Sequence, residues 1–482
     1  MNLNELTILE ARAKLDKGEI TALDLTKACL AQIGAMNTKL NAVLTVAESE
    51  ALAQAREADE RLKNGERGEL LGIPYLVKDN ILTKGIRTTA GSKMLENYVA
   101  PYDATVVARL QEAGAIMLGK TNLDEFAHGA STEYSYFGAT KNPHDTERVP
   151  GGSSGGSAVA VASNMCLFAL GTDTGGSVRH PASFCGVVGL KPSYGLCSRF
   201  GLIAMTSSTD VPGVLAKTAG DALAVLKVMQ GKDEKDSTTV DLKVDIKNLK
   251  LFTKFKNLKI KNSLQGLRVG FAKEYFVDLP DKEVEEKVLA AIAKMKDLGA
   301  EIVDIRLPHT KYGVSAYYII TPCEISSNLA RFDGLRYGFK ETDEDLIKYY
   351  NATRGAGFGA EVKRRIMLGT YALSSGYYDA YYLKAQAVRT KIIEDFNEAF
   401  TQVDIIVTPT TPTTAFKLGE QQNDPLKMYL EDIFLTPASL AGLPAVNLPA
   451  GMIKNLPIGY QLIGPRFSDE NLLEIGSIYE KS

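Results

Sequence analysis

The chain has 482 residues, of which 45% are hydrophobic and 23% are charged. Its 55 lysines and arginines almost balance 58 aspartates and glutamates, so the formal net charge is −3. Without a basic excess to neutralise phosphates, the chain is not expected to bind nucleic acid strongly through its own charge. The composition is that of a globular protein with ample length for a large core.

The cysteines and the N-terminus indicate a cytoplasmic protein. Five widely spaced cysteines form no Cys-x-x-Cys motif, which favours reduced thiols over disulfides or a metal site. The first residues, Met1–Glu5, lack the basic and apolar regions of a signal peptide. Ser163 and Asn164 interrupt the most apolar stretch, so no membrane span is expected.

Hydrophobic periodicity predicts helices and strands along the whole chain. Helices are expected at Thr7–Lys17, Thr21–Met36, Ser49–Lys63, Asp103–Ala113 and Glu283–Leu298. Strands are expected at 70–78, 114–121, Leu267–Ala272, Glu301–Ile305 and Asp404–Val407. The alternation of helix and strand is typical of α/β layering.

Large α/β sheets can absorb this length in one unit, so residues 1–482 are interpreted as a single domain. Within it we distinguish a helical N-terminal part, a core with the active site, a surface excursion rich in Lys, Asp, Asn and Thr, and a second half that completes the sheet and the substrate pocket. These parts are 1–66, 67–230, 231–264 and 265–482.

Two glycine-rich stretches, Val149–Ser157 and Asp173–Pro181, are interpreted as the active site. Successive glycines let backbone N–H groups turn inward as a nest that holds an oxyanion or a phosphate. The run from Thr174 to Ser177 suits an oxyanion hole because a possible nucleophile closes it. A flexible linker is disfavoured, since apolar core residues follow the first stretch directly.

A lysine, Lys78, ends the apolar run at 70–78. Burial at the end of a strand would favour its neutral form and make it a usable base. Considered without its surroundings, Lys78 could also be a lysine whose amine extends to solvent.

Three other kinds of site fit parts of the sequence. Gly114 to Thr121 matches a P-loop formally, although a helix precedes it and the residues between its glycines form a strand. The run from Gly151 to Gly155 matches a nucleophile elbow, for which His180 or His309 would be the base. Cys166 and Cys185 flank the active stretch, and each is either a nucleophile or a small buried apolar residue.

Lys78, Ser153 and Ser177 at this spacing resemble the amidase signature family. The resemblance implies a large central mixed β-sheet covered by helices on both faces. It makes Ser177 the nucleophile, Ser153 a bridging serine preceded by a cis peptide, and Lys78 the base. The oxyanion hole is then formed by the backbone of Thr174, Gly175, Gly176 and Ser177.

Four further motifs are similar to the glutaminase subunits of tRNA-dependent amidotransferases within this family. They are Arg331–Gly338, Glu361–Ile366, Leu373–Tyr382 and Thr436–Pro444. The resemblance implies that Tyr317, Arg365 and Asp432 bind glutamine. The nearby residues Tyr318, Arg364 and Asp424 are alternative assignments. An arginine for the carboxylate and an aspartate for the ammonium suit a free amino acid.

The same resemblance implies partners. Ammonia would pass to a tRNA-binding kinase subunit, which uses ATP and Mg to amidate Glu-tRNA(Gln) or Asp-tRNA(Asn), and a small third subunit would wrap this chain. No cofactor is expected here, and tRNA would be reached only through the complex. His128 and His180 depart from the family pattern in the pocket. A stand-alone amidase for small amides is the alternative, whereas a non-catalytic scaffold would lack Lys78 or Ser177.

Overall fold

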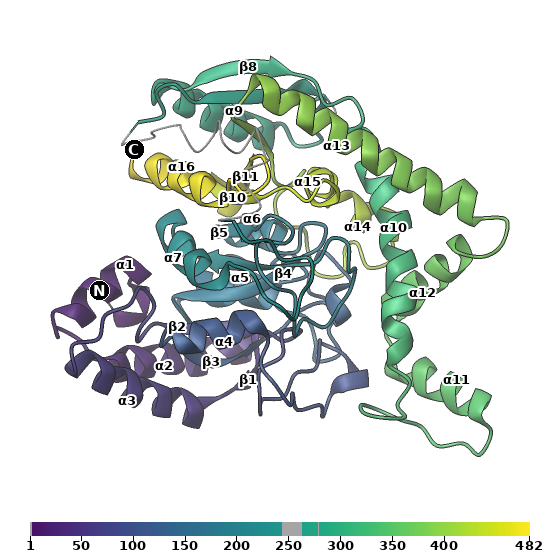
Figure 1. Ribbon diagram of the computed structural model, residues 1–482, viewed down its shortest axis with the longest axis horizontal. Coiled ribbons are helices and arrows are strands. Elements are labelled where there is room, and N and C mark those ends of the chain that lie inside the picture. Colours follow the sequence, from purple (N-terminus) through teal and green to yellow (C-terminus); the bar gives the residue numbers. More distant parts are fainter. Residues whose placement is uncertain (1, 243–262, 278) are drawn as a thin grey trace.

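Within residues 2–242, 263–277 and 279–482, which the computed structural model describes, eleven strands form one mixed sheet (Figure 1). The strands are β1 (Val43–Val46), β2 (Pro74–Lys78), β3 (Ile116–Thr121), β4 (Phe168–Asp173), β5 (Val188–Lys191), β6 (Val211–Ala216), β7 (Arg268–Ala272), β8 (Glu301–Ile305), β9 (Ile405–Pro409), β10 (Ala445–Ile453) and β11 (Leu456–Ile463). Their order across the sheet is β1-β3-β2-β4-β6-β5-β10-β11-β9-β7-β8. The predicted α/β architecture is therefore confirmed.

Two half-sheets meet at the antiparallel hairpin of β10 and β11. On one side β10 pairs with β5, and Ala445 lies opposite Lys191. On the other side β11 pairs with β9, and Ile463 lies opposite Ile406. Parallel pairs occur inside each half, between β2 and its neighbours β3 and β4 and between β7 and its neighbours β8 and β9. The sheet is continuous from the N-terminal to the C-terminal half of the chain.

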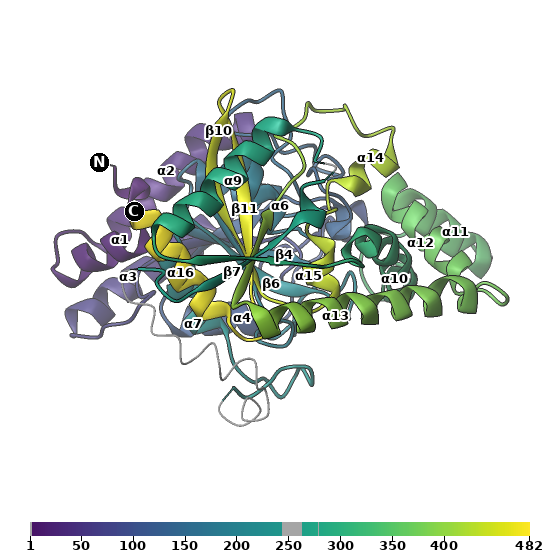
Figure 2. The same cartoon turned by 90° about the horizontal axis from the view of Figure 1, so that it is seen from above.

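Helices cover both faces of this sheet (Figure 2). They are α1 (Ile8–Asp16), α2 (Ala22–Leu40), α3 (Glu48–Lys63), α4 (Thr105–Glu112), α5 (Gly155–Ala162), α6 (Arg179–Cys185), α7 (Ala219–Met229), α9 (Lys282–Asp297), α10 (Gly313–Asn328), α11 (Leu346–Gly357), α12 (Ala360–Ala372), α13 (Lys384–Gln402), α14 (Pro425–Leu430), α15 (Thr436–Leu440) and α16 (Asp469–Lys481). The short helices α5 and α6, which follow the two glycine-rich stretches, pack directly on the strands.

The predicted helices and strands are present, with shifted ends. Helix α2 continues past Asn37 to Leu40, because the Asn37 side chain accepts hydrogen bonds from Ala42 N (2.9 Å) and Val43 N (2.8 Å) beyond the helix. Asn41, at a left-handed φ of 49°, ends it. The N-terminal part is not only helical, because β1 joins the sheet edge between α2 and α3.

Part of the predicted organisation stays a prediction. The surface excursion at 231–264 lies largely outside the described residues. The continuous sheet is compatible with one domain, but the divisions at 66, 230 and 264 are not tested by it.

A layer of helices, α10 to α12, stands on the side of the molecule opposite α1 to α3 in both views (Figures 1 and 2). Helices α10 and α12 pack closely against each other. A Cβ at Gly369 of α12 would overlap the carbonyl oxygen of Pro322 in α10. Glycine therefore allows this approach, which brings α12 beside the site.

Candidate active site

Lys78 is fully buried at the end of β2, and its amine is surrounded by hydroxyls. Nζ lies 2.8 Å from Ser153 Oγ, 2.9 Å from Ser154 Oγ and 3.0 Å from Thr172 Oγ1. Burial lowers the Lys78 pKa to about 7, against the smaller opposite effect of Asp124 and other carboxylates nearby. A large fraction of this amine is therefore neutral near neutral pH.

Ser153 lies at the start of the turn that leads into α5 and is fully buried. The Gly152–Ser153 peptide bond is cis, as the resemblance implied. The next residue, Ser154, donates its backbone N–H to the carbonyl oxygen of Ser177 at 3.0 Å. This bond joins the two glycine-rich stretches and places the predicted bridging serine beside the loop of the predicted nucleophile.

Ser177 follows a tight turn at the end of β4. Gly176 adopts a φ of 152°, and a Cβ there would lie 2.5 Å from Leu435 Cδ1, so the turn requires glycine. The turn is held by a buried ion pair, in which Arg179 Nε lies 3.0 Å from Asp173 Oδ2. Burial raises the pKa of Asp173, but the charge and hydrogen bonds of Arg179, with smaller contributions from other groups, outweigh this effect, so the pKa lies below its usual value. The carboxylate thus stays charged and also accepts from Val178 N at 3.2 Å.

The backbone N–H groups of residues 174–177 make no hydrogen bond to any residue that the structure describes. Buried backbone donors are nearly always paired, so a run of free ones beside a serine is unusual. Such a run can stabilise a developing oxyanion.

Arg365 on α12 is buried and leaves part of its guanidinium available. Its Nε donates to Glu361 Oε1 at 2.8 Å, and its Cζ lies 5.1 Å from the centre of the Tyr318 ring and 5.3 Å from that of Tyr429. Within the described residues, its two terminal nitrogens have no hydrogen-bond acceptor. This fork can bind a carboxylate with two hydrogen bonds.

Tyr317 and Asp432 lie against the glycine turn. A Cβ at Gly175 would be 2.5 Å from the Tyr317 hydroxyl oxygen, and one at Gly176 would be 3.2 Å from Asp432 Oδ1. Tyr318 donates to Asp432 Oδ2 at 2.8 Å, which leaves Oδ1 without a donor among the described residues. Burial raises the Asp432 pKa to about 6 despite His180 and Tyr318. Above that pH, Asp432 can receive an ammonium group.

The alternative assignments differ in position. Arg364 points outward, with 39% of its side chain exposed, and pairs with Glu361. Asp424 is exposed and caps α14 by accepting from Lys427 N at 3.0 Å. Tyr318 shares the site with Tyr317 through its bond to Asp432. The structure therefore places Tyr317 and Asp432 against the Ser177 turn and Arg365 over the ring of Tyr318, which donates to Asp432. Arg364 and Asp424 lie outside.

Residues 24–473 match the family model described as Amidase. The chain belongs to the amidase family. The A-subunit of Glutamyl-tRNA(Gln) amidotransferase from Thermoanaerobacter pseudethanolicus is 53% identical over 483 residues, 100% of this chain and 97% of the relative. The protein of the same name from Carboxydothermus hydrogenoformans is 52% identical over 484 residues, 100% of this chain and 98% of the relative.

Solved amidase structures share the fold. The crystal structure of the Glutamyl-tRNA(Gln) amidotransferase A-subunit from Thermotoga maritima has a TM-score of 0.79 and 43% identity, covering 100% of this chain and 96% of that one. The peptide amidase from Stenotrophomonas maltophilia has a TM-score of 0.80 and 30% identity, covering 98% of this chain and 96% of that one. Both neighbours have the amidase signature fold, which confirms the family and the fold expected from the sequence.

The other kinds of site are not supported in this amidase. Lys120 of the formal P-loop is fully buried in β3, donates to Ile81 O at 2.7 Å and lies 3.3 Å from Asp79. Burial raises the pKa of Cys166 and of Cys185, so neither is an activated thiol. His309 Nδ1 lies 2.8 Å from Asp395 on α13 and is paired with this carboxylate. His180 is buried beside Gly151, but within the described residues neither of its ring nitrogens has a hydrogen-bond partner, and Ser153 is bonded to Lys78 instead.

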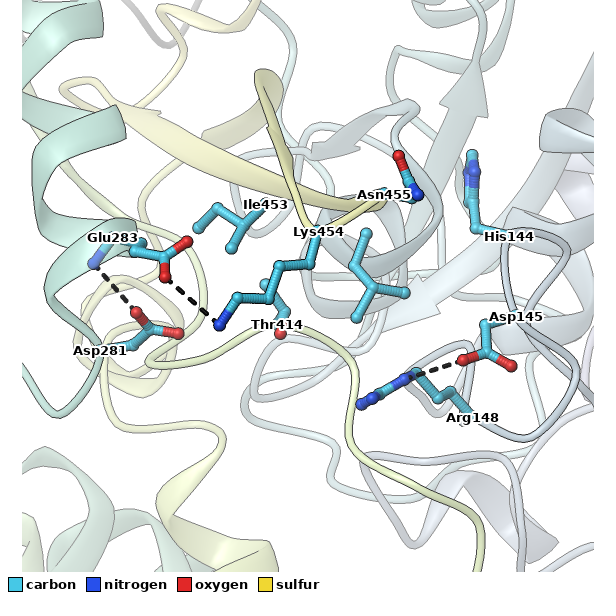
Figure 3. Close-up of a pocket in the computed structure, with 10 residues that line it drawn as sticks. His144, Asp145, Arg148, Asp281, Glu283, Thr414, Ile453, Lys454 and Asn455 are labelled. Atoms are coloured by element: carbon cyan, nitrogen blue, oxygen red, sulfur yellow. Dashed lines mark hydrogen bonds and ion pairs between the residues drawn. The ribbon is translucent and has the colours of Figure 1, made fainter.

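A separate hollow of about 470 Å³ lies beside the turn between β10 and β11 (Figure 3). Its charges are largely paired with one another, Lys454 with Glu283 at 3.4 Å and Arg148 with Asp145 at 3.0 Å. It contains none of the predicted site residues. In the described part of the chain no cluster of metal-binding side chains occurs, and no helix is long and apolar enough to span a membrane.

Several residues of the site were not singled out in the sequence. Ser154 and Thr172 surround the Lys78 amine, and Glu361 and Tyr429 hold Arg365, with Tyr429 donating to Glu361 at 3.0 Å. Glu361 lies four residues before Arg365, the spacing at which helical side chains meet, so this signal was present. Tyr429 carried no local signal, because its role depends on the packing of α14 beside α12.

Proposed function

We propose that this amidase is the glutamine-hydrolysing subunit of a tRNA-dependent amidotransferase. Two groups carry the proposal. The terminal nitrogens of Arg365 have no acceptor among the described residues, and Asp432 Oδ1, next to the Ser177 turn, has no donor among them. Arg365 and Asp432 together match the carboxylate and the ammonium of a free amino acid. An amidase for simple amides would need neither charge.

Ser177 is the proposed nucleophile. Neutral Lys78 takes the proton of Ser153, and Ser153 takes that of Ser177, so that Ser177 Oγ attacks the side-chain amide carbon of glutamine. The free N–H groups of residues 174–177 would hold the resulting oxyanion, an effect of about 3 kcal/mol per donor in comparable sites.

Collapse of this tetrahedral species releases ammonia. The proton held by Lys78 returns through Ser153 to the leaving nitrogen, and the C–N bond breaks to leave a γ-glutamyl ester on Ser177. Water then attacks the ester along the same proton route and releases glutamate. The hydroxyls of Ser154 and Thr172 keep the Lys78 amine oriented toward Ser153 throughout.

The partners follow from the proposed role. Relatives carry the name of an amidotransferase A-subunit, which implies that other subunits exist. We propose that a kinase subunit binds tRNA and uses ATP and Mg to activate the misacylated tRNA, that a small third subunit binds this chain, and that the complex works in the cytoplasm. The near-neutral charge supports this division, since this chain need not bind tRNA itself.

Ammonia release from glutamine tests the proposal. The purified chain is assayed alone and together with the kinase subunit, the small subunit, charged tRNA and ATP, as wild type and as Ser177→Ala. We expect release that increases with the partners and is lost in the variant. Equal activity on simple amides without any partner effect would instead identify a stand-alone amidase, and an active Ser177→Ala protein would overturn the triad.

A further inference from the structure

The loop from Asp124 to Thr132 connects the predicted triad to the helix that carries Arg365. Both links are made at the start of the loop. Asp124 N donates to Ser153 O at 3.3 Å, and the next residue, Glu125, accepts through Oε2 from the N–H of Gly359, which precedes α12, at 2.8 Å. Phe126 and Ala127 adopt left-handed φ values of 49° and 64°. Such backbone persists where surrounding contacts hold it, and it commonly marks functional sites.

His128 lies in this loop with a fully buried ring. Its Nδ1 is 2.7 Å from the carbonyl oxygen of Phe126, which can only accept, so Nδ1 carries the hydrogen. Burial lowers the His128 pKa to about 3, and the nearby Arg365 contributes in the same direction, so the ring is neutral. In this tautomer Nε2 is a pure acceptor.

No donor among the described residues reaches His128 Nε2. A buried acceptor without a donor is costly, and beside a ligand site it marks a place for a ligand N–H. The carboxylate that Arg365 would bind has no hydrogen to give. The group attached to the same carbon, the α-ammonium, has three.

We propose that His128 Nε2 accepts a hydrogen bond from the α-ammonium of the substrate and so helps this amidase to select a free amino acid. The inference rests on the proposed function, since it takes glutamine as the substrate. His128 acts in binding and not in the chemical step, because the ammonium does not react. Together with Asp432 it would give the ammonium two acceptors of different kinds, one charged and one neutral.

A pair of variants separates the two ring nitrogens. His128→Asn keeps an N–H for the Phe126 carbonyl and removes the acceptor at the Nε2 position, whereas His128→Gln can present an oxygen there. We expect His128→Asn to raise KM for glutamine about 10-fold to 100-fold with kcat nearly unchanged, and His128→Gln to recover part of the loss. His309→Asn, the same change at a half-exposed histidine, should have no effect.

Glutaramate is glutamine without the α-amino group. It separates the loss of a hydrogen bond to the ammonium from a general distortion of the site. Its inhibition constant should be the same for wild type and His128→Asn. A similar loss of affinity for both compounds, or an unchanged KM for glutamine, would overturn the inference and leave the proposed function standing. A wild-type protein that releases no ammonia from glutamine would overturn both.

A spectroscopic measurement covers the case in which His128→Asn does not fold. The chain has four histidines, so the ¹⁵N resonances of a histidine-labelled Ser177→Ala protein can be assigned. We expect glutamine to shift the His128 Nε2 resonance and glutaramate to leave it in place. If glutamine binds but the ¹⁵N chemical shift of His128 Nε2 does not change, the inference is contradicted.

Discussion

Lys78 ends one interior strand of the sheet and Ser177 follows another, whereas Tyr317 and Arg365 are carried by helices at the side of the molecule. The surroundings differ accordingly. Nearly every residue of β2, β4 and α5 is buried, while Met367 on α12 is 73% exposed. The proposed chemical groups thus lie in the core of the sheet, whereas Tyr317 and Arg365 are buried on the inner face of helices whose outer face is exposed.

This difference makes a kinetic prediction about the two regions. Changes on the sheet side should lower kcat and leave glutamine affinity nearly intact. Changes on the helix side should raise KM and leave kcat nearly intact.

The largest effect is expected for Ser177→Ala, which removes the proposed nucleophile. We expect ammonia release to fall about 10⁴-fold or more, as for other serine nucleophiles, with the calorimetric Kd for glutamine nearly unchanged. Ser326→Ala on α10 is the matched control, because among the described residues this hydroxyl bonds only to Cys323 O of its own helix. Substantial turnover by Ser177→Ala would assign the chemistry to another group.

Lys78→Ala should lower kcat about 10²-fold to 10⁴-fold, because it removes the proposed base. In the wild type, the pKa of Lys78 of about 7 predicts that kcat/KM rises with pH through this value, since only the neutral amine accepts a proton. The check is a pH–rate profile of the wild type. A profile that is flat between about pH 6 and pH 8 would argue against Lys78 as the base.

Arg365→Lys should raise KM for glutamine about 10-fold to 100-fold, because lysine cannot supply two parallel N–H donors to a carboxylate. Steady-state kinetics with Arg364→Lys as control sharpens the test, since Arg364 is the adjacent residue and points outward. Equal effects of both variants would contradict the assignment. If kcat falls and KM does not change, Arg365 acts in the chemical step and not in substrate binding.

The smallest effect is expected for Tyr429→Phe. This change removes one hydrogen bond to Glu361, which also receives Arg364 and Arg365, so Arg365 should stay in place and KM should rise less than about fivefold. Kinetics on glutamine measure it. A loss as large as that of Arg365→Lys would show that the fork depends on this tyrosine.

The stretches that carry the proposed triad could be located in the sequence because their signals are local, whereas the roles of their residues came from the resemblance. Glycine-rich turns and a lysine that ends an apolar run can be recognised without knowledge of distant segments. Tyr317, Arg365 and Asp432 came only from resemblance, since they lie on α10, on α12 and in the turn between α14 and α15, which only the fold brings together. Strands such as β5 and β6 were missed because their pairing, for example Val188 opposite Ala216, is set by long-range contacts. The predicted helix end at Met36 was wrong, because the helix runs on to Leu40 and the Asn37 side chain bonds to the backbone beyond it.

The hairpin that joins the two half-sheets has a consequence for synthesis of the chain. All of the proposed catalytic and substrate residues precede β10, so they leave the ribosome before the hairpin that unites their two halves. Arg179, which holds Asp173 beside the nucleophile turn, also donates to Gln461 Oε1 of β11 at 2.9 Å. We therefore expect a nascent chain to lack the complete support of the nucleophile turn until its last strands are in place.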